Sequence, residues 1–183
     1  MRRAFGFLFV AVSIAVGAGA VLAETVSAFK LPIYYQAAAW LASFGTTFGI
    51  SANTFRKILP AIRDRMKNSV AWPTTAKALN GVCWAGPFAA IGLFPQAYHF
   101  LLLLGIGLGN LSTYLLMKEY SGLDNREQAI VGIISLLAIP IAFELDRTFA
   151  LSNHDVSVML SRVLIAIAYA LGGLYALIVK ETH

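Results

Sequence analysis

The feature that most constrains this chain is residues 31–51, a run that contains no charged residue. A helix of about 20 apolar residues is long enough to cross the roughly 30 Å hydrocarbon core of a bilayer. Over all 183 residues, 58% are hydrophobic and only 13% are charged, whereas a soluble domain carries about 25% charged residues. So few charges cannot cover a water-soluble globule. The composition therefore predicts an all-α integral membrane protein.

Further apolar runs extend this prediction to six transmembrane helices. We expect one polytopic membrane domain over residues 1–183, a six-helix bundle with spans at about 4–23, 31–51, 78–94, 97–117, 129–143 and 158–179. The first run follows a basic start and ends in Val21-Leu22-Ala23, so it also resembles a cleavable secretory signal. We favour a retained helix, and either interpretation leaves the remaining topology unchanged.

The basic residues predict the orientation of this bundle. With both termini in the cytosol, eleven Lys and Arg residues lie on the inner side, Arg162 lies within the sixth span, and only Lys30 and Arg147 lie outside. Cytoplasmic connections of membrane proteins carry an excess of Lys and Arg. The sequence therefore predicts a multi-pass protein with both termini inside, and we expect it in the cell (inner) membrane.

Residues 53–67, between the second and third spans, form a basic amphipathic segment. Apolar residues recur there at near-helical spacing with cations between them, which is typical of a helix lying among lipid headgroups. Its predicted partner is the anionic headgroups of the cytoplasmic side. The alternative is a solvated loop that only enforces orientation, and Pro60 predicts either a kink or the start of a separate short helix. The headgroup-binding candidates are Arg56, Lys57, Arg63, Arg65 and Lys67.

Uncharged polar residues of the predicted spans gather at middle to inner depth. Such side chains need partners in hydrocarbon, from other helices, water or a ligand. They are therefore candidates for lining a pore or a cavity for a small uncharged or zwitterionic solute or a lipid headgroup. Hydrogen bonds between helices are the alternative. The residues are Thr46, Thr47, Asn80, Asn110, Ser112, Thr113 and Tyr169.

Charged residues are absent from the middle of every predicted span. Charges kept at that depth serve proton relays, ion coupling or voltage sensing. Their absence disfavours proton-driven or sodium-driven transport through a single subunit. Pro87 and Pro140 lie inside spans, and because broken helices line the binding sites of transporters, they slightly favour transport.

Glycines predict close packing of helices. Gly105 and Gly109 form a G-x-x-x-G pattern in the fourth span, and Gly172 and Gly173 lie in the sixth. Missing side chains let another helix approach closely. We therefore expect a homo-oligomer or an association with other membrane subunits.

Two imidazoles and three carboxylates lie near the predicted outer boundary. They could bind a divalent cation or titrate with pH, but their spacing resembles no metal motif. We therefore interpret them as scattered, solvated residues. We also expect Arg162 to snorkel outward or to pair with Glu144 or Asp146, tying the fifth span to the sixth. The boundary residues are His99, Glu144, Asp146, His154 and Asp155.

The motifs of several enzyme classes are missing. The sequence contains no H-E-x-x-H, no G-x-S-x-G and no phosphate-cradling glycine loop. It favours a protein that is not an enzyme and has no catalytic residues, cofactor, metal site or nucleic-acid partner. The leading hypothesis is a small channel or facilitator for an uncharged small solute or ion. The alternative is a non-catalytic membrane subunit or assembly protein that docks other membrane helices.

Overall fold

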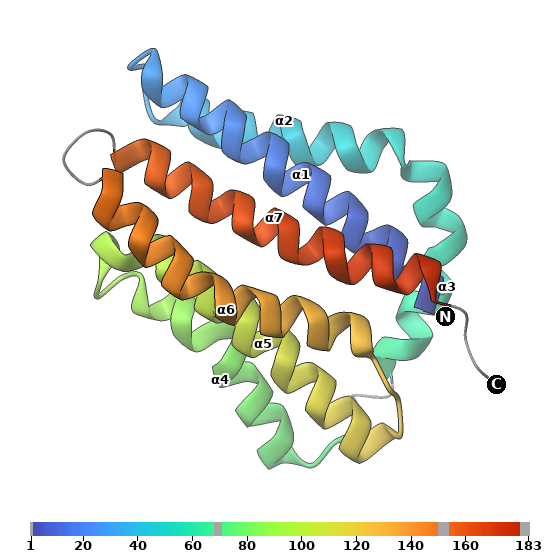
Figure 1. The fold of residues 1–183 in the computed structure, drawn as a ribbon. Helices are drawn as coiled ribbons and strands as arrows, with labels where there is room; N and C mark the ends of the chain where they lie inside the picture. Colours follow the sequence, from blue (N-terminus) through green and yellow to red (C-terminus); the bar gives the residue numbers. More distant parts are fainter. Residues whose placement is uncertain (1, 68–70, 150–153, 180–183) are drawn as a thin grey trace.

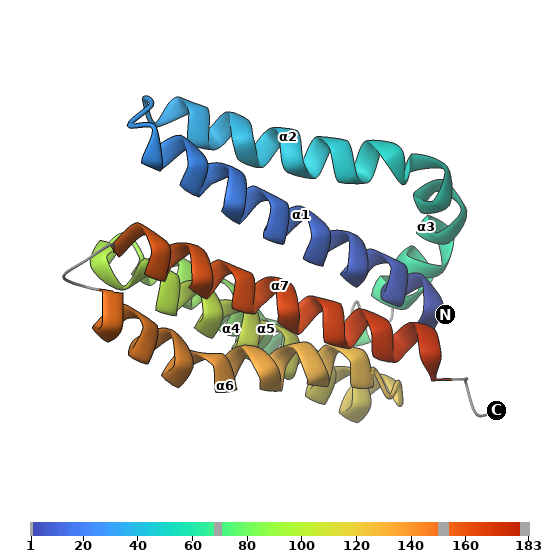
Figure 2. The same ribbon diagram turned by 45° about the horizontal axis from the view of Figure 1, so that its top comes forward.

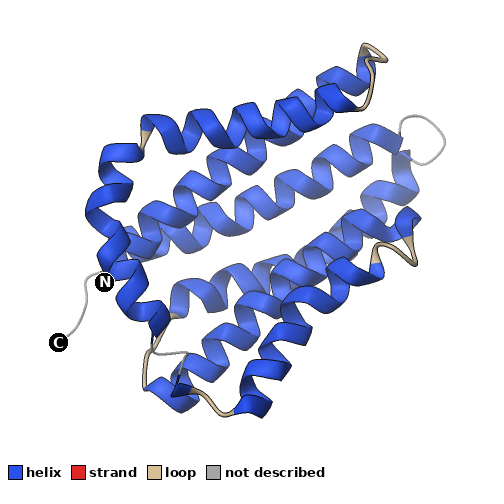
Figure 3. Ribbon diagram, turned by 180° about the vertical axis from the view of Figure 1, so that it is seen from behind, coloured by secondary structure: helices blue, strands red, loops and turns tan. Residues whose placement is uncertain are grey.

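The computed structural model describes residues 2–67, 71–149 and 154–179, and these are helical apart from short connections (Figure 3). This confirms the all-α class, since the described residues contain no strand. A short 3₁₀ helix, η2 (Pro95–Ala97), precedes α5. The α-helices are α1 (Arg2–Ala28), α2 (Tyr34–Ile50), α3 (Ala52–Lys67), α4 (Thr74–Ala90), α5 (Tyr98–Ser121), α6 (Arg126–Phe149) and α7 (His154–Ile178).

Four of the described helical segments are long and apolar enough to cross a membrane: α1, η2 with α5, α6 and α7. This is consistent with a multi-pass membrane protein. Helices α2 and α4 have 17 residues each, about 25 Å at 1.5 Å per residue, which is shorter than the roughly 30 Å hydrocarbon core. Six membrane crossings therefore stay a prediction.

The long helices alternate in direction along the chain. The start of α1, the end of α7, the α5–α6 turn and helix α3 lie at one end of the molecule, here named the α3 end (Figure 1). The α1–α2 and α4–α5 turns, the end of α6 and the start of α7 lie at the opposite end. From their contacts, the helices follow the order α2, α1, α7, α6, α5, α4. Figure 2 shows α2 beside α1 at one edge of this row. The first helix therefore packs against the last, and α2 and α4 form the two edges of the row.

The core lies between α5, α6, α7 and α1. Val131, Ala138 and Ala142 face inward from α6 and share one hydrophobic cluster with Leu103 of α5 and Tyr169 of α7. Their spacing of seven and four residues puts them on one side of α6. The interior of this helix row is therefore formed by the apolar side of each of these helices.

Glycines allow these helices to approach closely. Gly105 and Gly109 of α5 lie against the rings of Phe88 and Trp84 of α4. Gly172 lies against α6 and Gly173 against α1. A side chain at any of these positions would collide with the neighbouring helix, so all four glycines serve packing within the chain.

Some helix bounds differ from the predicted spans. Helix α4 covers residues 74–90 rather than 78–94, because residues 91–94 form a turn, with the amide of Phe94 bonded to the carbonyl of Ala90 before Pro95. Helix α6 continues past the predicted end at 143 to Phe149, where Thr148 Oγ1 bonds the Glu144 carbonyl at 2.7 Å. The residues that follow the predicted fifth span are therefore helical up to residue 149.

Residues 53–67 lie in a single helix, α3, with Pro60 inside it. This confirms the helical interpretation of the basic segment, and the alternative of a solvated loop is wrong. Pro87 and Pro140 likewise lie inside continuous helices, α4 and α6. A proline in a helix interior gives up one backbone hydrogen bond, which the rest of each helix tolerates here.

Candidate functional site

Asn80, Ser112 and Thr113 meet in a polar cluster between α4 and α5. The Asn80 side-chain oxygen accepts hydrogen bonds from Ser112 Oγ at 2.8 Å and Thr113 Oγ1 at 3.0 Å. Trp84 Nε1 donates to Thr113 Oγ1 at 3.0 Å, and both hydroxyls lie close to the Gly109 carbonyl, at 3.1 and 2.7 Å. These three pore candidates are thus joined by hydrogen bonds between two helices.

Asn110 and Tyr169 form a second, separate pair. Both side chains are buried. Asn110 Nδ2 donates to the Ile106 carbonyl at 2.9 Å within its own helix and to the Tyr169 hydroxyl at 3.4 Å. The Phe9 ring meets the Tyr169 ring edge-on at 5.3 Å. This pair therefore links α5 to α7 inside the apolar core.

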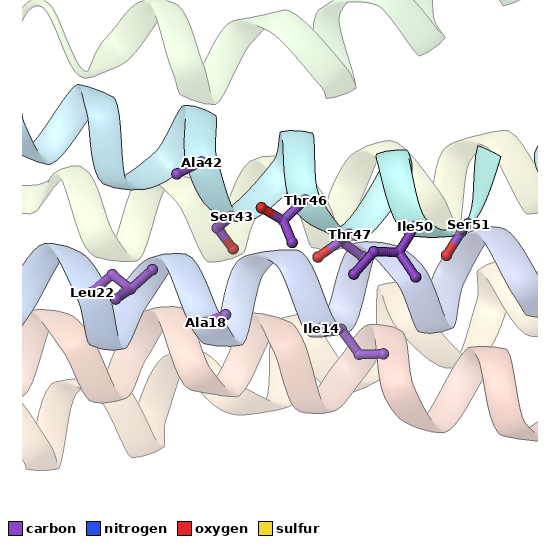
Figure 4. Close-up of a pocket in the computed structure, with 9 residues that line it drawn as sticks. All are labelled: Ile14, Ala18, Leu22, Ala42, Ser43, Thr46, Thr47, Ile50 and Ser51. Atoms are coloured by element: carbon purple, nitrogen blue, oxygen red, sulfur yellow. The ribbon is translucent and has the colours of Figure 1, made fainter.

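Thr46 and Thr47 lie in a third place, an open groove of about 470 Å³ between α1 and α2 (Figure 4). Ser43 joins the two helices by donating a 2.6 Å hydrogen bond to the Ala15 carbonyl. The pore candidates are therefore distributed over three places and do not surround one cavity. The groove is lined by Ile14, Ala18, Leu22, Ala42, Ser43, Thr46, Thr47, Ile50 and Ser51.

At the α3 end, the sequence analysis missed a buried carboxylate, Glu127. Its side chain has no exposed surface, and Oε1 lies 2.7 Å from Arg65 Nη1. Oε2 lies 3.8 Å from Arg2 Nε, and the Arg65 guanidinium stacks over the Phe5 ring at 4.3 Å. Glu127 lies four residues before Val131 and therefore on the same inward-facing side of α6. This spacing could have indicated from the sequence that Glu127 is buried. The ion pair joins α6, α3 and α1.

This ion pair separates Arg65 from the other headgroup-binding candidates. The side chain of Arg65 is only 5% exposed, so its charge is turned toward the bundle and not toward a membrane surface. Arg56, Lys57, Arg63 and Lys67 are exposed. The physical reason is helical geometry, because residue 65 falls on the same side of α3 as the buried Ile62.

At the opposite end, the boundary residues are less scattered than expected. Asp146 Oδ1 lies 3.1 Å from His154 Nδ1 and 3.7 Å from His99 Nε2, and it accepts a hydrogen bond from Ser157 Oγ at 3.2 Å. His99 is 1% exposed, and neither ring nitrogen has a hydrogen-bond partner among the described residues. Glu144 pairs with Arg147 at the surface, at 3.6 Å. The prediction of solvated residues is therefore wrong for His99.

The predicted pairing of Arg162 with Glu144 or Asp146 is also wrong. Arg162 Nη2 donates to the Tyr98 hydroxyl at 3.0 Å, and its guanidinium lies 5.5 Å from the ring centroids of both Tyr98 and Trp40. Arg162 therefore ties α7 to the start of α5 and to α2, and not to α6. Aromatic faces attract a guanidinium, which explains this alternative to an ion pair.

Together these contacts connect helices and form no catalytic arrangement that we can identify. Among the residues that the structure describes, no group of three or more His, Cys, Asp or Glu side chains is placed to hold a metal ion. A scan of protein-family models gives no match to the chain, and searches of curated proteins and of solved structures give none either.

Proposed function

We propose that this chain is a non-catalytic membrane subunit of the cell membrane that docks another membrane helix against α2. The observation that carries the proposal is the open glycine face of this helix. A Cβ atom added at Gly45 or Gly49 would meet no atom of the described chain within 4 Å. Small residues four apart let two membrane helices approach closely, and this pair packs against no other helix among the described residues.

The glycines of the interior provide the contrast. A Cβ added at Gly105, Gly107, Gly132 or Gly173 would lie within 3.0 Å of an atom of another helix. Those positions are small because a neighbouring helix already occupies the space. By the same reasoning, we infer that the glycine pair of α2 packs against a helix of another molecule.

The rest of α2 agrees with this interpretation. Ala38, Ala42, Gly45 and Gly49 are exposed, and their spacing of four, three and four residues puts them on one side of the helix. The only residue of α2 that is buried is Ser43, on the α1 side. As an edge of the helix row, α2 is reachable by a second molecule (Figure 2).

The docked helix that we propose is α2 of a second copy. Two identical faces related by a two-fold axis present the same small residues to each other, which is the commonest symmetry of oligomers. Helix α2 carries no charge that would repel its counterpart. The proposed assembly is therefore a homodimer with its α2 helices in contact, and it agrees with the oligomer predicted from the sequence.

The test is the dimer dissociation constant of purified protein in detergent and in lipid nanodiscs. Gly45→Leu and Gly49→Leu should raise this constant by at least about tenfold, because leucines would hold the two helices apart. Gly81→Leu on α4 is the matched control, since Gly81 also meets no described atom within 4 Å but has no second glycine four residues away. A monomeric wild type, or an equal loss in Gly81→Leu, would contradict the proposal.

A channel or facilitator for an uncharged small solute or ion stays a prediction. Asn80, Ser112 and Thr113 bond one another, and Asn110 bonds Tyr169, so these residues already have partners within the chain. Liposome flux separates the two hypotheses. A pore should lose its flux in Asn80→Leu while the protein still assembles, whereas wild-type liposomes without solute flux would favour the subunit.

A further inference from the structure

Helix α3 has three distinct sides. At 100° per residue, Arg56, Arg63 and Lys67 fall within about 40° of one another around the helix axis, and all three are exposed. The apolar residues Leu59 and Met66 point about 70° away from them and are 40% and 60% exposed. The third side faces the bundle.

The bundle side is fixed by Ile62 and Arg65, which are both buried. Ile62 belongs to the main hydrophobic cluster, and Arg65 forms the ion pair with Glu127 of α6. This pair sets the rotation of α3 about its own axis, so that the cationic and exposed apolar sides are held outward together. Figure 2 shows α3 turning away from α2 across the end of the bundle.

The outward cations lack strong partners within the described part of the chain. Arg56, Lys57 and Arg63 form no ion pair with a described residue. Lys67 lies 3.3 Å from Asp64, with both side chains largely exposed, and exposed pairs of this kind bind weakly. The surface therefore carries an excess of positive charge that complements an anionic ligand.

We propose that this outward surface of α3 binds the anionic headgroups of membrane phospholipids. The exposed Leu59 and Met66 beside the cations distinguish a lipid from an acidic protein, because an interfacial helix places its apolar side among acyl chains and its cations among headgroups. Arg65 contributes as a positioning residue through Glu127 and not as a ligand. The proposal is independent of the dimer face on α2.

The test is binding of phosphatidylglycerol and phosphatidylcholine to the purified full chain in detergent, measured by native mass spectrometry. Arg56→Gln/Arg63→Gln should weaken phosphatidylglycerol binding roughly 10- to 30-fold, since each basic residue near an anionic surface contributes about fivefold or more. Lys30→Gln/Arg147→Gln removes the same charge from elsewhere and should leave binding unchanged. Circular dichroism checks that each variant keeps its helices.

A second experiment distinguishes a lipid ligand from an acidic protein ligand. Leu59→Gln should weaken binding to vesicles that contain phosphatidylglycerol and leave binding of a polyglutamate peptide unchanged. Equal wild-type affinity for the two phospholipids would overturn the proposal, and so would equal losses in both double variants. Polyglutamate binding with no effect of Leu59→Gln on vesicles would also overturn it, in favour of an acidic protein partner.

Discussion

Arg65 Nη1 and Glu127 Oε1 lie 2.7 Å apart at a place where neither side chain is more than 5% exposed. The pair connects α3 to α6, 62 positions further along the chain, as the numbering shows (127 − 65). A buried pair of charges costs desolvation energy, so its main effect is to fix where α3 sits. Each of the two buried charges is stabilised by the other.

Glu127→Gln should lower the free energy of unfolding by about 3–5 kcal/mol, because it removes the carboxylate that lies against the buried Arg65 guanidinium. Reversible unfolding in mixed micelles measures this change. Glu144→Gln is the control, since it removes a carboxylate from the exposed pair with Arg147 and should cost less than about 1 kcal/mol. Equal effects of the two substitutions would mean that the buried pair is not coupled to folding.

The double substitution Glu127→Leu/Arg65→Met should recover most of the stability that Glu127→Gln loses. Replacing both partners of a buried ion pair by apolar residues of similar volume is often neutral. Unfolding under the same conditions measures the recovery. If the double variant is as unstable as the single one, the ion pair stabilises the fold by more than the neutralisation of two buried charges.

His99→Leu should leave the stability unchanged or raise it. The imidazole is buried, and neither ring nitrogen is hydrogen-bonded within the described residues, whereas an apolar side chain carries no polar group to desolvate. Leu103→Ala, one turn further along the same buried face, should cost about 2–5 kcal/mol. A loss above about 2 kcal/mol in His99→Leu would show that His99 requires Asp146 as its partner.

Asn80→Leu should cost about 0.6 to 1.7 kcal/mol, which are about the average and the largest contribution of a hydrogen bond between membrane helices. The loss is moderate because Ser112 and Thr113 can still donate to the Gly109 carbonyl of their own helix. Ser13→Leu on α1 is the comparison, because the Ser13 hydroxyl has no hydrogen-bond partner among the described residues, and it should cost less. A loss above about 3 kcal/mol in Asn80→Leu would point to a larger network.

The helical class followed from the composition and the long apolar runs, and the amphipathic pattern of residues 53–67 predicted α3, because these signals lie within short stretches of the sequence. The partners of Arg65, Arg162 and His99 depend instead on which helices become neighbours. Nothing in the local pattern of α1 indicates that it packs against α7, so the contacts of Phe9 with Tyr169 could not be derived. Glu127 was missed because its neighbours, Asp124 to Gln128, read as a polar turn.

Gly109→Leu tests whether the interior glycines and the glycine pair of α2 differ as proposed. A Cβ at Gly109 would overlap the Trp84 ring, so the larger side chain must push α4 away from α5 and break the Trp84–Thr113 hydrogen bond. Overpacking of this kind costs about 1–3 kcal/mol or more, and the fluorescence of Trp84 should change with it. Gly45→Leu should leave the unfolding of the monomer within about 0.5 kcal/mol of wild type, because it meets open space. Equal destabilisation of the monomer by both substitutions would mean that the α2 face is already occupied within the chain.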